Sequence, residues 1–188
     1  DFRFGNDREG DLEFIEEQGR RYGYRAGPTP TESIGGERVS STRIRRALEA
    51  ADFAEAERLL GRPYSISGKV IYGRQLGQTI GTPTANLELR RLRAPLSGVY
   101  AVEVSGAGLE AAWGVANVGV RPTIDDSIKA NLEVHLLDRE IGLYGQHIEV
   151  TFRHKLRDEK KFETMEELML NIARDIDNTR DWFVRHQA

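Results

Sequence analysis

The sequence predicts a mainly antiparallel β domain, either a sandwich or a small barrel, that follows a mostly helical segment of about 62 residues. From residue 64 onward, short runs rich in β-branched and aromatic residues alternate with Gly, Pro or Asp turns. Their close spacing is typical of all-β domains. The preceding residues carry helix signals instead, and the character changes at Gly61-Arg62-Pro63. We therefore expect two domains, residues 1–62 and 63–188.

Helices are expected at three places in the first segment. Residues 11–23 place apolar side chains toward one side and end near Gly23. A brief strand and a Pro-rich loop are expected over residues 24–33. Ser40 or Ser41 is expected to cap a second helix, and Asp52 with Glu55 a third.

Five strands are expected at residues 64–72, 98–104, 111–120, 131–138 and 146–156. Alternation along the last strand places Ile148, Val150 and Phe152 on its core face. A final helix over residues 162–183 is expected to begin with a capping box of Thr164 and Glu167 and to lie against the β domain. Its apolar stripe comprises Met165, Leu168, Met169, Ile172 and Ile176.

The composition excludes several classes of function. The formal charge of −3 and a pI near 5.9 disfavour a nucleic-acid partner, which usually requires a basic field. The absence of cysteine excludes disulfides, thiolate catalysis and cysteine-ligated zinc. No apolar run approaches the roughly 18 residues of a membrane span, and the charged start lacks a signal-peptide core. We expect a soluble, cytoplasmic protein without a membrane partner.

A glycine-rich stretch, GRQLGQTIGTPTAN, is the first candidate site. Gly73, Gly77 and Gly81 allow a tight turn and close approach of backbone N–H groups to an anion. No Gly-Lys-Ser/Thr follows, so the stretch is not a Walker loop. A plain hairpin loop remains the alternative. Thr84 and Asn86 point the same way on an extended segment and suit Mg²⁺ together with substrate phosphates, or else they only hydrogen-bond the loop.

Three further clusters could carry chemistry. On the strand ANLEVHLLD, Glu133 and His135 share the face opposite the core, where Glu133 could act as a general base and His135 could contact a nucleotide, unless the face is simply solvated. The segment KLRDEKKF offers a cationic and aromatic rim or a solvated turn. In VSSTRIR, hydroxyls and arginines at a helix start could hold a phosphate.

Taken together, these segments resemble the bacterial bifunctional riboflavin kinase/FMN adenylyltransferase family, also called FAD synthetases. The resemblance covers nearly the whole chain and rests on motifs that occur in family order: GRPYSISGKVIYG, GTPTAN, GVYAVEV, NVGVRPT, LEVHLLD, LYGQHIEV and LRDEKKF. It implies a six-stranded antiparallel Greek-key barrel of the riboflavin kinase type. It also implies phosphoryl transfer from ATP to the ribityl 5′-hydroxyl of riboflavin, which yields FMN and ADP.

The resemblance also assigns roles to individual residues. It implies Glu133 as catalytic base and Thr84 and Asn86 as Mg²⁺ and phosphate ligands. The implied ATP contacts are Gly73, Gly77, Gly81, His135 and Tyr144, the implied flavin-side rim is Arg157, Lys160 and Phe162, and the implied phosphate contacts of an adenylyltransferase are Ser41, Thr42 and Arg45.

Two positions depart from the family pattern. Gln78 stands where a basic residue is common, and Thr82 replaces a usual Phe or Ile. The first 62 residues resemble the tail of a Rossmann-like nucleotidyltransferase domain without its His-x-Gly-His signature. We therefore expect a truncated remnant that makes no FAD from FMN, followed by an active kinase module. The alternative is a non-catalytic flavin- or nucleotide-binding barrel. The oligomeric state does not follow from the sequence.

Overall fold

The computed structural model describes residues 3–28, 30–73, 81–89, 94–122, 128–139 and 141–186. The chain divides into two compact units, Asp1–Val39 and Ser40–Ala188. The compact unit that contains the β domain thus begins at Ser40. The domain boundary expected after residue 62, from the change of sequence character at Gly61-Arg62-Pro63, stays a prediction.

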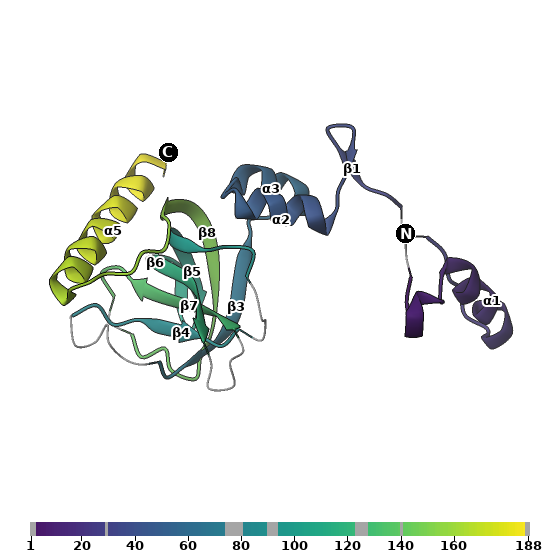
Figure 1. Cartoon of the computed structure of the whole chain (residues 1–188), viewed down its shortest axis with the longest axis horizontal. Coiled ribbons are helices and arrows are strands. Elements are labelled where there is room, and N and C mark those ends of the chain that lie inside the picture. Colours follow the sequence, from purple (N-terminus) through teal and green to yellow (C-terminus); the bar gives the residue numbers. More distant parts are fainter. Residues whose placement is uncertain are drawn as a thin grey trace. The chain divides into compact units, whose positions relative to one another are not determined.

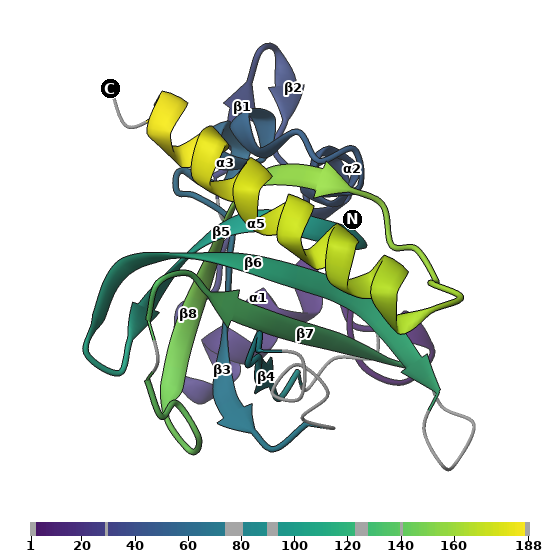
Figure 2. The ribbon, with the colours of Figure 1, turned by 90° about the vertical axis from the view of Figure 1, so that its left-hand side faces the viewer.

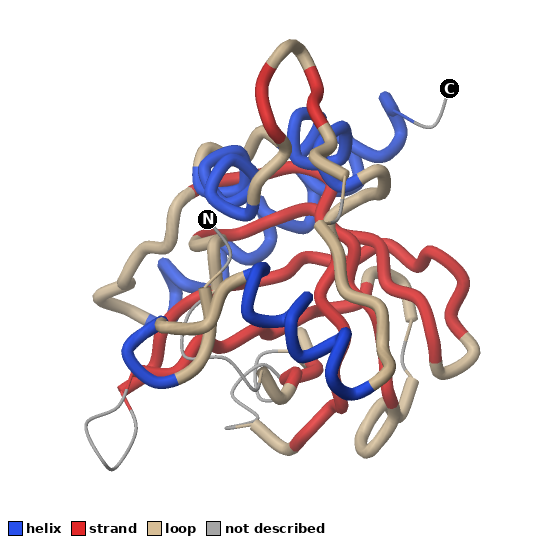
Figure 3. Tube along the Cα trace, turned by 90° about the vertical axis from the view of Figure 1, so that its right-hand side faces the viewer, coloured by secondary structure: helices blue, strands red, loops and turns tan. Residues whose placement is uncertain are grey.

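The first unit holds a 3-10 turn η1 (Asn6–Arg8), helix α1 (Leu12–Tyr22) and a two-stranded hairpin of β1 (Ser33–Ile34) and β2 (Glu37–Arg38). Figure 3 shows this hairpin as a short red pair of strands. Asp11 caps α1 by accepting a 3.0 Å hydrogen bond from the Phe14 backbone N–H, and Gly23 ends it in the left-handed conformation. The helix therefore lies where the sequence predicts it. The brief strand expected from Tyr24 does not form among the described residues 24–28, since extended pairing begins only at Ser33.

The second unit begins with helices α2 (Ser41–Glu49) and α3 (Phe53–Leu60). Ser40 caps α2 by accepting from the Arg43 backbone N–H, and Asp52 caps α3 by accepting from that of Glu55. The ring of Phe53 packs edge to face with that of Tyr100, with centroids 5.9 Å apart. It also stacks on the ring of Phe152, with centroids 6.3 Å apart. These aromatic contacts attach the helix pair to the β domain.

Six strands form a closed antiparallel barrel in the order β3-β4-β7-β6-β5-β8 (Figures 1 and 2). Their bounds are β3 (Ser65–Ile71), β4 (Ala85–Leu87), β5 (Gly98–Gly106), β6 (Leu109–Pro122), β7 (Ile128–Leu136) and β8 (His147–Arg157). After the three consecutive strands β5, β6 and β7, the chain returns to place β8 beside β5, which is a Greek key. The barrel confirms the predicted fold class. The three-residue β4 lies in the segment that was expected to be extended at Thr84 and Asn86, and the family resemblance implied a sixth strand in the barrel.

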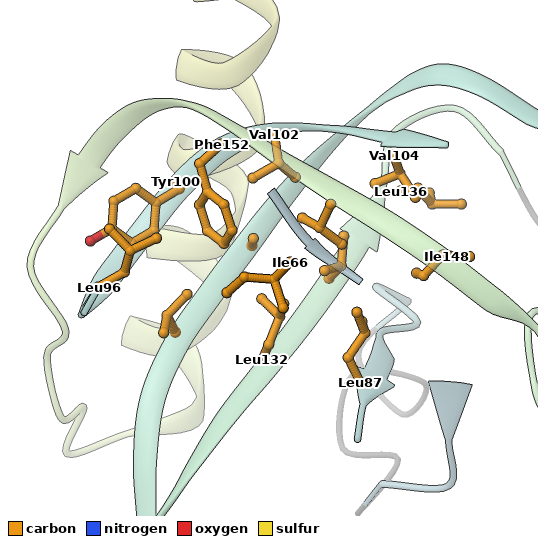
Figure 4. Packing of buried hydrophobic residues seen from close by; sticks show 14 of the residues in the cluster. Ile66, Leu87, Leu96, Tyr100, Val102, Val104, Leu132, Leu136, Ile148 and Phe152 are labelled. Carbon is orange, nitrogen blue, oxygen red and sulfur yellow. The ribbon is translucent and has the colours of Figure 1, made fainter. Parts of the chain in front are cut away.

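The barrel interior is an apolar core built from alternate residues of the strands. Val102, Leu132, Val150 and Phe152 are each at most 1% exposed, and Figure 4 shows labelled core side chains converging from several strands. Burying such a side chain is worth about 1.5–3 kcal/mol. The core face predicted for β8 is confirmed.

Helix α5 (Met165–His186) packs on β5, β6 and β8 and lies across the outside of the barrel in Figure 2. Its start agrees with the predicted cap, because Thr164 accepts a hydrogen bond from the Glu167 backbone N–H. The predicted apolar stripe is partly wrong, since Met165 and Met169 are about half exposed. The stripe is rotated because the far end of α5 is fixed by Phe183, Thr179 and Asp175, which are buried.

Aromatic stacking fixes the C-terminal half of α5. Phe183 stacks on Trp113 with ring centroids 4.9 Å apart, and Trp182 lies between the rings of His154 and His186. Burial, together with the neighbouring His186, lowers the pKa of His154.

Among the described residues, no helix is both long and apolar enough to cross a membrane.

Replacing Phe53 with Ala should destabilise the barrel unit by about 2 kcal/mol, less than the cost of a fully buried Phe because this ring is only partly buried. Urea unfolding followed by tryptophan fluorescence measures this change, since both tryptophans of the chain lie in this unit. The control Val184→Ala, at a position 69% exposed, should have almost no effect. Equal effects of the two substitutions would mean that α3 is not held by its aromatic contacts.

Candidate active site

A cavity of about 280 Å³ lies between the outer wall of the barrel and α5. Its volume is close to the lower end of the range for small-molecule sites, about 300 Å³. The helix contributes apolar side chains and one buried carboxylate, whereas the barrel contributes most of the polar ones. We call it the helix-side cavity; its lining residues are Thr82, Thr84, Val99, Val115, Asn117, Glu133, His135, Arg157, Glu159, Lys160, Phe162, Leu168, Ile172, Asp175 and Ile176.

A row of residues in register crosses five strands and forms part of this cavity wall. Asn86 on β4 lies opposite Glu133 on β7, and Glu133 lies opposite Asn117 on β6. Asn117 in turn pairs with Val99 on β5, which pairs with Arg157 on β8. Directly opposed residues share a face of the sheet and have Cβ atoms about 4.5–5.5 Å apart. The row therefore brings together residues that are up to 71 positions apart in the sequence.

Glu133 is held within this row by a neighbour on its own strand. The side-chain amide of Asn131 donates a 2.9 Å hydrogen bond to Glu133 Oε1. Residues two apart on a strand share a face, so this contact follows from strand geometry. It orients the carboxylate that lines the helix-side cavity.

His135 ties the segment before β4 to β7. Its Nδ1 lies 2.9 Å from the carbonyl oxygen of Pro83, and because a carbonyl only accepts, Nδ1 carries the proton. The ring lines the helix-side cavity together with Glu133. The structure thus gives His135 a positioning role, and its contact with a nucleotide stays a prediction.

A second cavity, of about 450 Å³, opens onto the barrel interior, since the core residues Val70, Val134 and Leu136 contribute to its wall. We call it the barrel-mouth cavity. Gly81, Pro83 and Thr84 lie on one side of it and Tyr144 on another. Tyr144 stacks on Tyr72 with ring centroids 4.2 Å apart, and both rings are substantially exposed. Thr84 lines both cavities, so its segment lies between them.

Two glycines are required by the backbone around Thr84 and Asn86. Gly81 has a φ of +75°, in the left-handed region that favours glycine. A Cβ on Gly73 would overlap the side-chain amide of Asn86, which is only 5% exposed. The backbone at Gly73 thus packs closely on Asn86, and the contact of Gly73 with ATP stays a prediction. Gly77 and Gln78 lie outside the described residues.

The donor set of Thr84 and Asn86 fits a magnesium ion. A hydroxyl and an amide oxygen are hard ligands, and Mg²⁺ commonly takes one or two protein ligands besides water and substrate phosphates. Within the described ranges, no group of three or more His, Cys, Asp or Glu side chains is arranged to hold a metal by itself. A metal at this position would therefore depend on the substrate for most of its ligands.

The predicted rim is brought together at the other end of the row. The guanidinium of Arg157 lies 5.5 Å from the centre of the Phe162 ring, and the ammonium of Lys160 lies 5.6 Å from it. Arg157 also makes a two-point hydrogen bond with Asp175, at 3.0 and 2.8 Å, and Lys160 pairs with Glu167 at 2.7 Å. The Lys160 ammonium holds the pKa of Glu167 below its ordinary value. The positive charge expected of this rim is therefore largely neutralised.

The three predicted adenylyltransferase residues lie elsewhere, in the first turns of α2. Ser41, Thr42 and Arg45 are exposed, and Arg45 donates a long 3.4 Å hydrogen bond to Ser41 Oγ. In the part of the chain that the structure describes, none of them lines either cavity. Their role as phosphate contacts stays a prediction.

Sequence reasoning missed four residues of the helix-side cavity or its supports. Asn131 and Asn117 gave a weak signal, since both are at outward-facing strand positions. Asn131 precedes Glu133 on β7, and Asn117 lies opposite Glu133 on β6. Asp175 gave none, since an acidic residue on a helix is usually solvated. Thr82 was noted only as a departure from the family pattern.

Comparison with known proteins agrees with this geometry. Residues 60–183 match the sequence profile of the family described as flavokinase, riboflavin kinase. The chain is 50% identical over 97% of its length to a bifunctional riboflavin kinase/FMN adenylyltransferase of Escherichia coli K12 and 43% identical over 97% to that of Haemophilus influenzae. A crystal structure described as a macrolide-efflux protein from Streptococcus pneumoniae is 32% identical, with a TM-score of 0.71 over 97% of this chain and 58% of that one.

The chain belongs to the riboflavin kinase family, because the profile covers about two thirds of it and the relatives align along almost all of it. It spans 58% of the length of the Escherichia coli relative and 59% of that from Haemophilus influenzae.

Replacing Asp175 with Ala should destabilise the barrel unit by about 2–3 kcal/mol, because it leaves Arg157 without the partner that neutralises it under α5. Thermal or urea unfolding measures this loss. The control Asp181→Ala removes the partner of Arg185 at an exposed pair and should cost less than about 0.5 kcal/mol. Similar costs at both positions would contradict a structural role for the Arg157–Asp175 pair.

Proposed function

We propose that this chain catalyses the Mg²⁺-dependent transfer of the γ-phosphoryl group of ATP to the 5′-hydroxyl of riboflavin, giving FMN and ADP. The observation that carries the proposal is the placement of Thr84, Asn86 and Glu133. Thr84 lines two cavities, and Asn86 lies directly opposite Glu133. The Glu133 carboxylate would thereby act beside the two side chains that we propose as metal ligands, where two substrates could meet.

The helix-side cavity suits the flavin. It is largely apolar beneath α5, and Phe162 offers an aromatic surface to a flat ring. Its cations are paired with Asp175 and Glu167, so a neutral ring system fits better here than a phosphorylated group. Arg157, Lys160 and Phe162 would therefore hold the ring mainly through shape and stacking.

The barrel-mouth cavity suits the nucleotide. Gly81 permits the close backbone approach that phosphate binding requires, and Tyr144, stacked on Tyr72, offers an aromatic surface. Thr84 lies at the border between this cavity and that of the flavin. The γ-phosphoryl group would thus lie at the side of the site that faces Glu133.

In the reaction, Glu133 accepts the proton of the 5′-hydroxyl as the oxygen attacks the γ-phosphorus. The new O–P bond forms as the bond from the γ-phosphorus to ADP breaks, and Glu133 later releases its proton to water. Asn131 donates a hydrogen bond to one carboxylate oxygen and so orients the carboxylate. Bound Mg²⁺, held by Thr84, Asn86 and phosphate oxygens, would neutralise charge that develops on the phosphates.

The remaining predictions from the sequence concern a second activity, the partners and the location of the protein. The longer relatives are described as bifunctional riboflavin kinase/FMN adenylyltransferases, and Ser41, Thr42 and Arg45 are proposed as phosphate contacts of an adenylyltransferase activity. Small-molecule partners follow from the proposed reaction. The absence of nucleic-acid or membrane partners and a cytoplasmic location stay predictions.

Replacing Glu133 with Gln should lower kcat for FMN formation by about 10²–10⁴-fold, the usual contribution of general base catalysis, while binding of riboflavin and of ATP changes little. The assay follows FMN formed from riboflavin, ATP and Mg²⁺, and removal of the metal with a chelator should abolish it. The control Glu149→Gln changes an outer-face residue of β8 that lines neither cavity and should preserve turnover. Full turnover in Glu133→Gln would remove this residue from the base role, and flavin binding without any turnover of the unmodified chain would favour the non-catalytic alternative.

A further inference from the structure

Two polar groups in the helix-side cavity lack a hydrogen-bond partner among the described residues. They are the hydroxyl of Thr82 and the side-chain oxygen of Asn117, and both atoms are buried. Both residues line the cavity, as does Glu133. A buried polar group without a partner costs about 1–3 kcal/mol, so such groups in a cavity wall indicate a bound partner.

The positions of the two residues relative to Glu133 are set by the backbone. Asn117 lies directly opposite Glu133 in the β6–β7 ladder. Thr82 directly precedes Pro83, whose carbonyl oxygen is bound by His135, two residues beyond Glu133 on β7. Both groups therefore belong to the part of the cavity that contains Glu133.

Three other polar side chains of this cavity are engaged in hydrogen bonds or ion pairs. Arg157 pairs with Asp175, Lys160 with Glu167 and His135 with Pro83. Val99, Val115 and the α5 side chains Leu168, Ile172 and Ile176 make much of the remaining wall apolar, and Thr84 and Glu159 also line it. Among the described lining residues, the buried polar atoms without a partner are therefore those of Thr82 and Asn117, and Asn117 lies directly opposite Glu133.

Thr82 and Asn117 offer complementary hydrogen-bonding groups. The Thr82 hydroxyl can both donate and accept a hydrogen bond, whereas the side-chain oxygen of Asn117 only accepts.

We propose that Thr82 and Asn117 form a subsite that binds the hydroxyl groups of the substrate's polyol chain and so selects flavins that carry this chain. This inference rests on the proposed function and adds a determinant of specificity to it. Ligand hydroxyls satisfy both the donor and the acceptor needs of the two residues. A site built to hydrogen-bond hydroxyls discriminates against analogues that lack them, because its own polar groups then stay unpaired.

The test compares the affinities of riboflavin and lumiflavin, a flavin with a methyl group in place of the polyol chain, by quenching of flavin fluorescence. Thr82→Val and Asn117→Leu each remove the polar group at nearly constant size. Each should weaken riboflavin binding about 3- to 10-fold, the value of one hydrogen bond, and leave lumiflavin binding unchanged within about 2-fold. Thr82→Ser keeps the hydroxyl and should retain the preference for riboflavin.

A second readout separates this role from a structural one. Removal of an unpartnered buried polar group should maintain or raise the thermal stability of the free protein, whereas loss of a structural hydrogen bond would lower it. Thr151→Val on β8 and Asn178→Ala on α5 are matched controls that line neither the helix-side nor the barrel-mouth cavity. Both should leave the affinity ratio unchanged.

The outcomes distinguish this inference from the proposed function. Equal weakening for the two flavins, or no weakening in either variant, would overturn the polyol subsite even if the chain still forms FMN. If the unmodified chain binds neither flavin and forms no FMN, the proposed function itself fails.

Discussion

The pairing of β4 between β3 and β7 is the constraint on which the candidate site depends. This strand has only three residues, Ala85–Leu87, yet it closes the barrel. Because side chains alternate along a strand, placing Leu87 in the core turns Asn86 outward and opposite Glu133. A shift of one residue in this register would exchange the two faces and separate Asn86 from the carboxylate. The burial of Leu87 in the core thus determines how Asn86 lies relative to Glu133.

Helix α5 supplies the second layer and sets the character of the helix-side cavity. Its aromatic anchors Trp182 and Phe183 lie near its C-terminus, whereas Leu168 and Ile172 lie over the cavity. Asp175 is buried between these two parts and neutralises Arg157. The same face of the helix therefore covers the cavity with apolar side chains and compensates the charge of Arg157. A cavity that is apolar under the helix and polar beside Glu133 suits a flat ring that carries a hydroxylated chain.

Much of this organisation could be predicted from the sequence. Period-two alternation identified β8 and β7 with their core faces, and caps at Ser40, Asp52 and Thr164 located three helix starts. What the sequence could not show was pairing between distant strands, since neither Asn117 nor Asp175 has a local signal for its partner. The stripe on α5 was misassigned at Met165 and Met169, because the buried face is fixed by stacking at Phe183 rather than by the apolar period of the first turns. The Thr82 hydroxyl became a candidate ligand contact only because the structure shows it buried without a hydrogen-bond partner.

The most direct measurement is a crystal structure of the chain bound to riboflavin, Mg²⁺ and ADP. The expected complex has the flavin ring beneath α5 against Phe162 and the 5′-oxygen within about 2.6–3.2 Å of a Glu133 carboxylate oxygen. The polyol hydroxyls should meet Thr82 and Asn117, and the metal should meet Thr84 and Asn86. A flavin ring in the barrel-mouth cavity beside Tyr144, with its 5′-oxygen beyond hydrogen-bonding reach of Glu133, would contradict the proposed site.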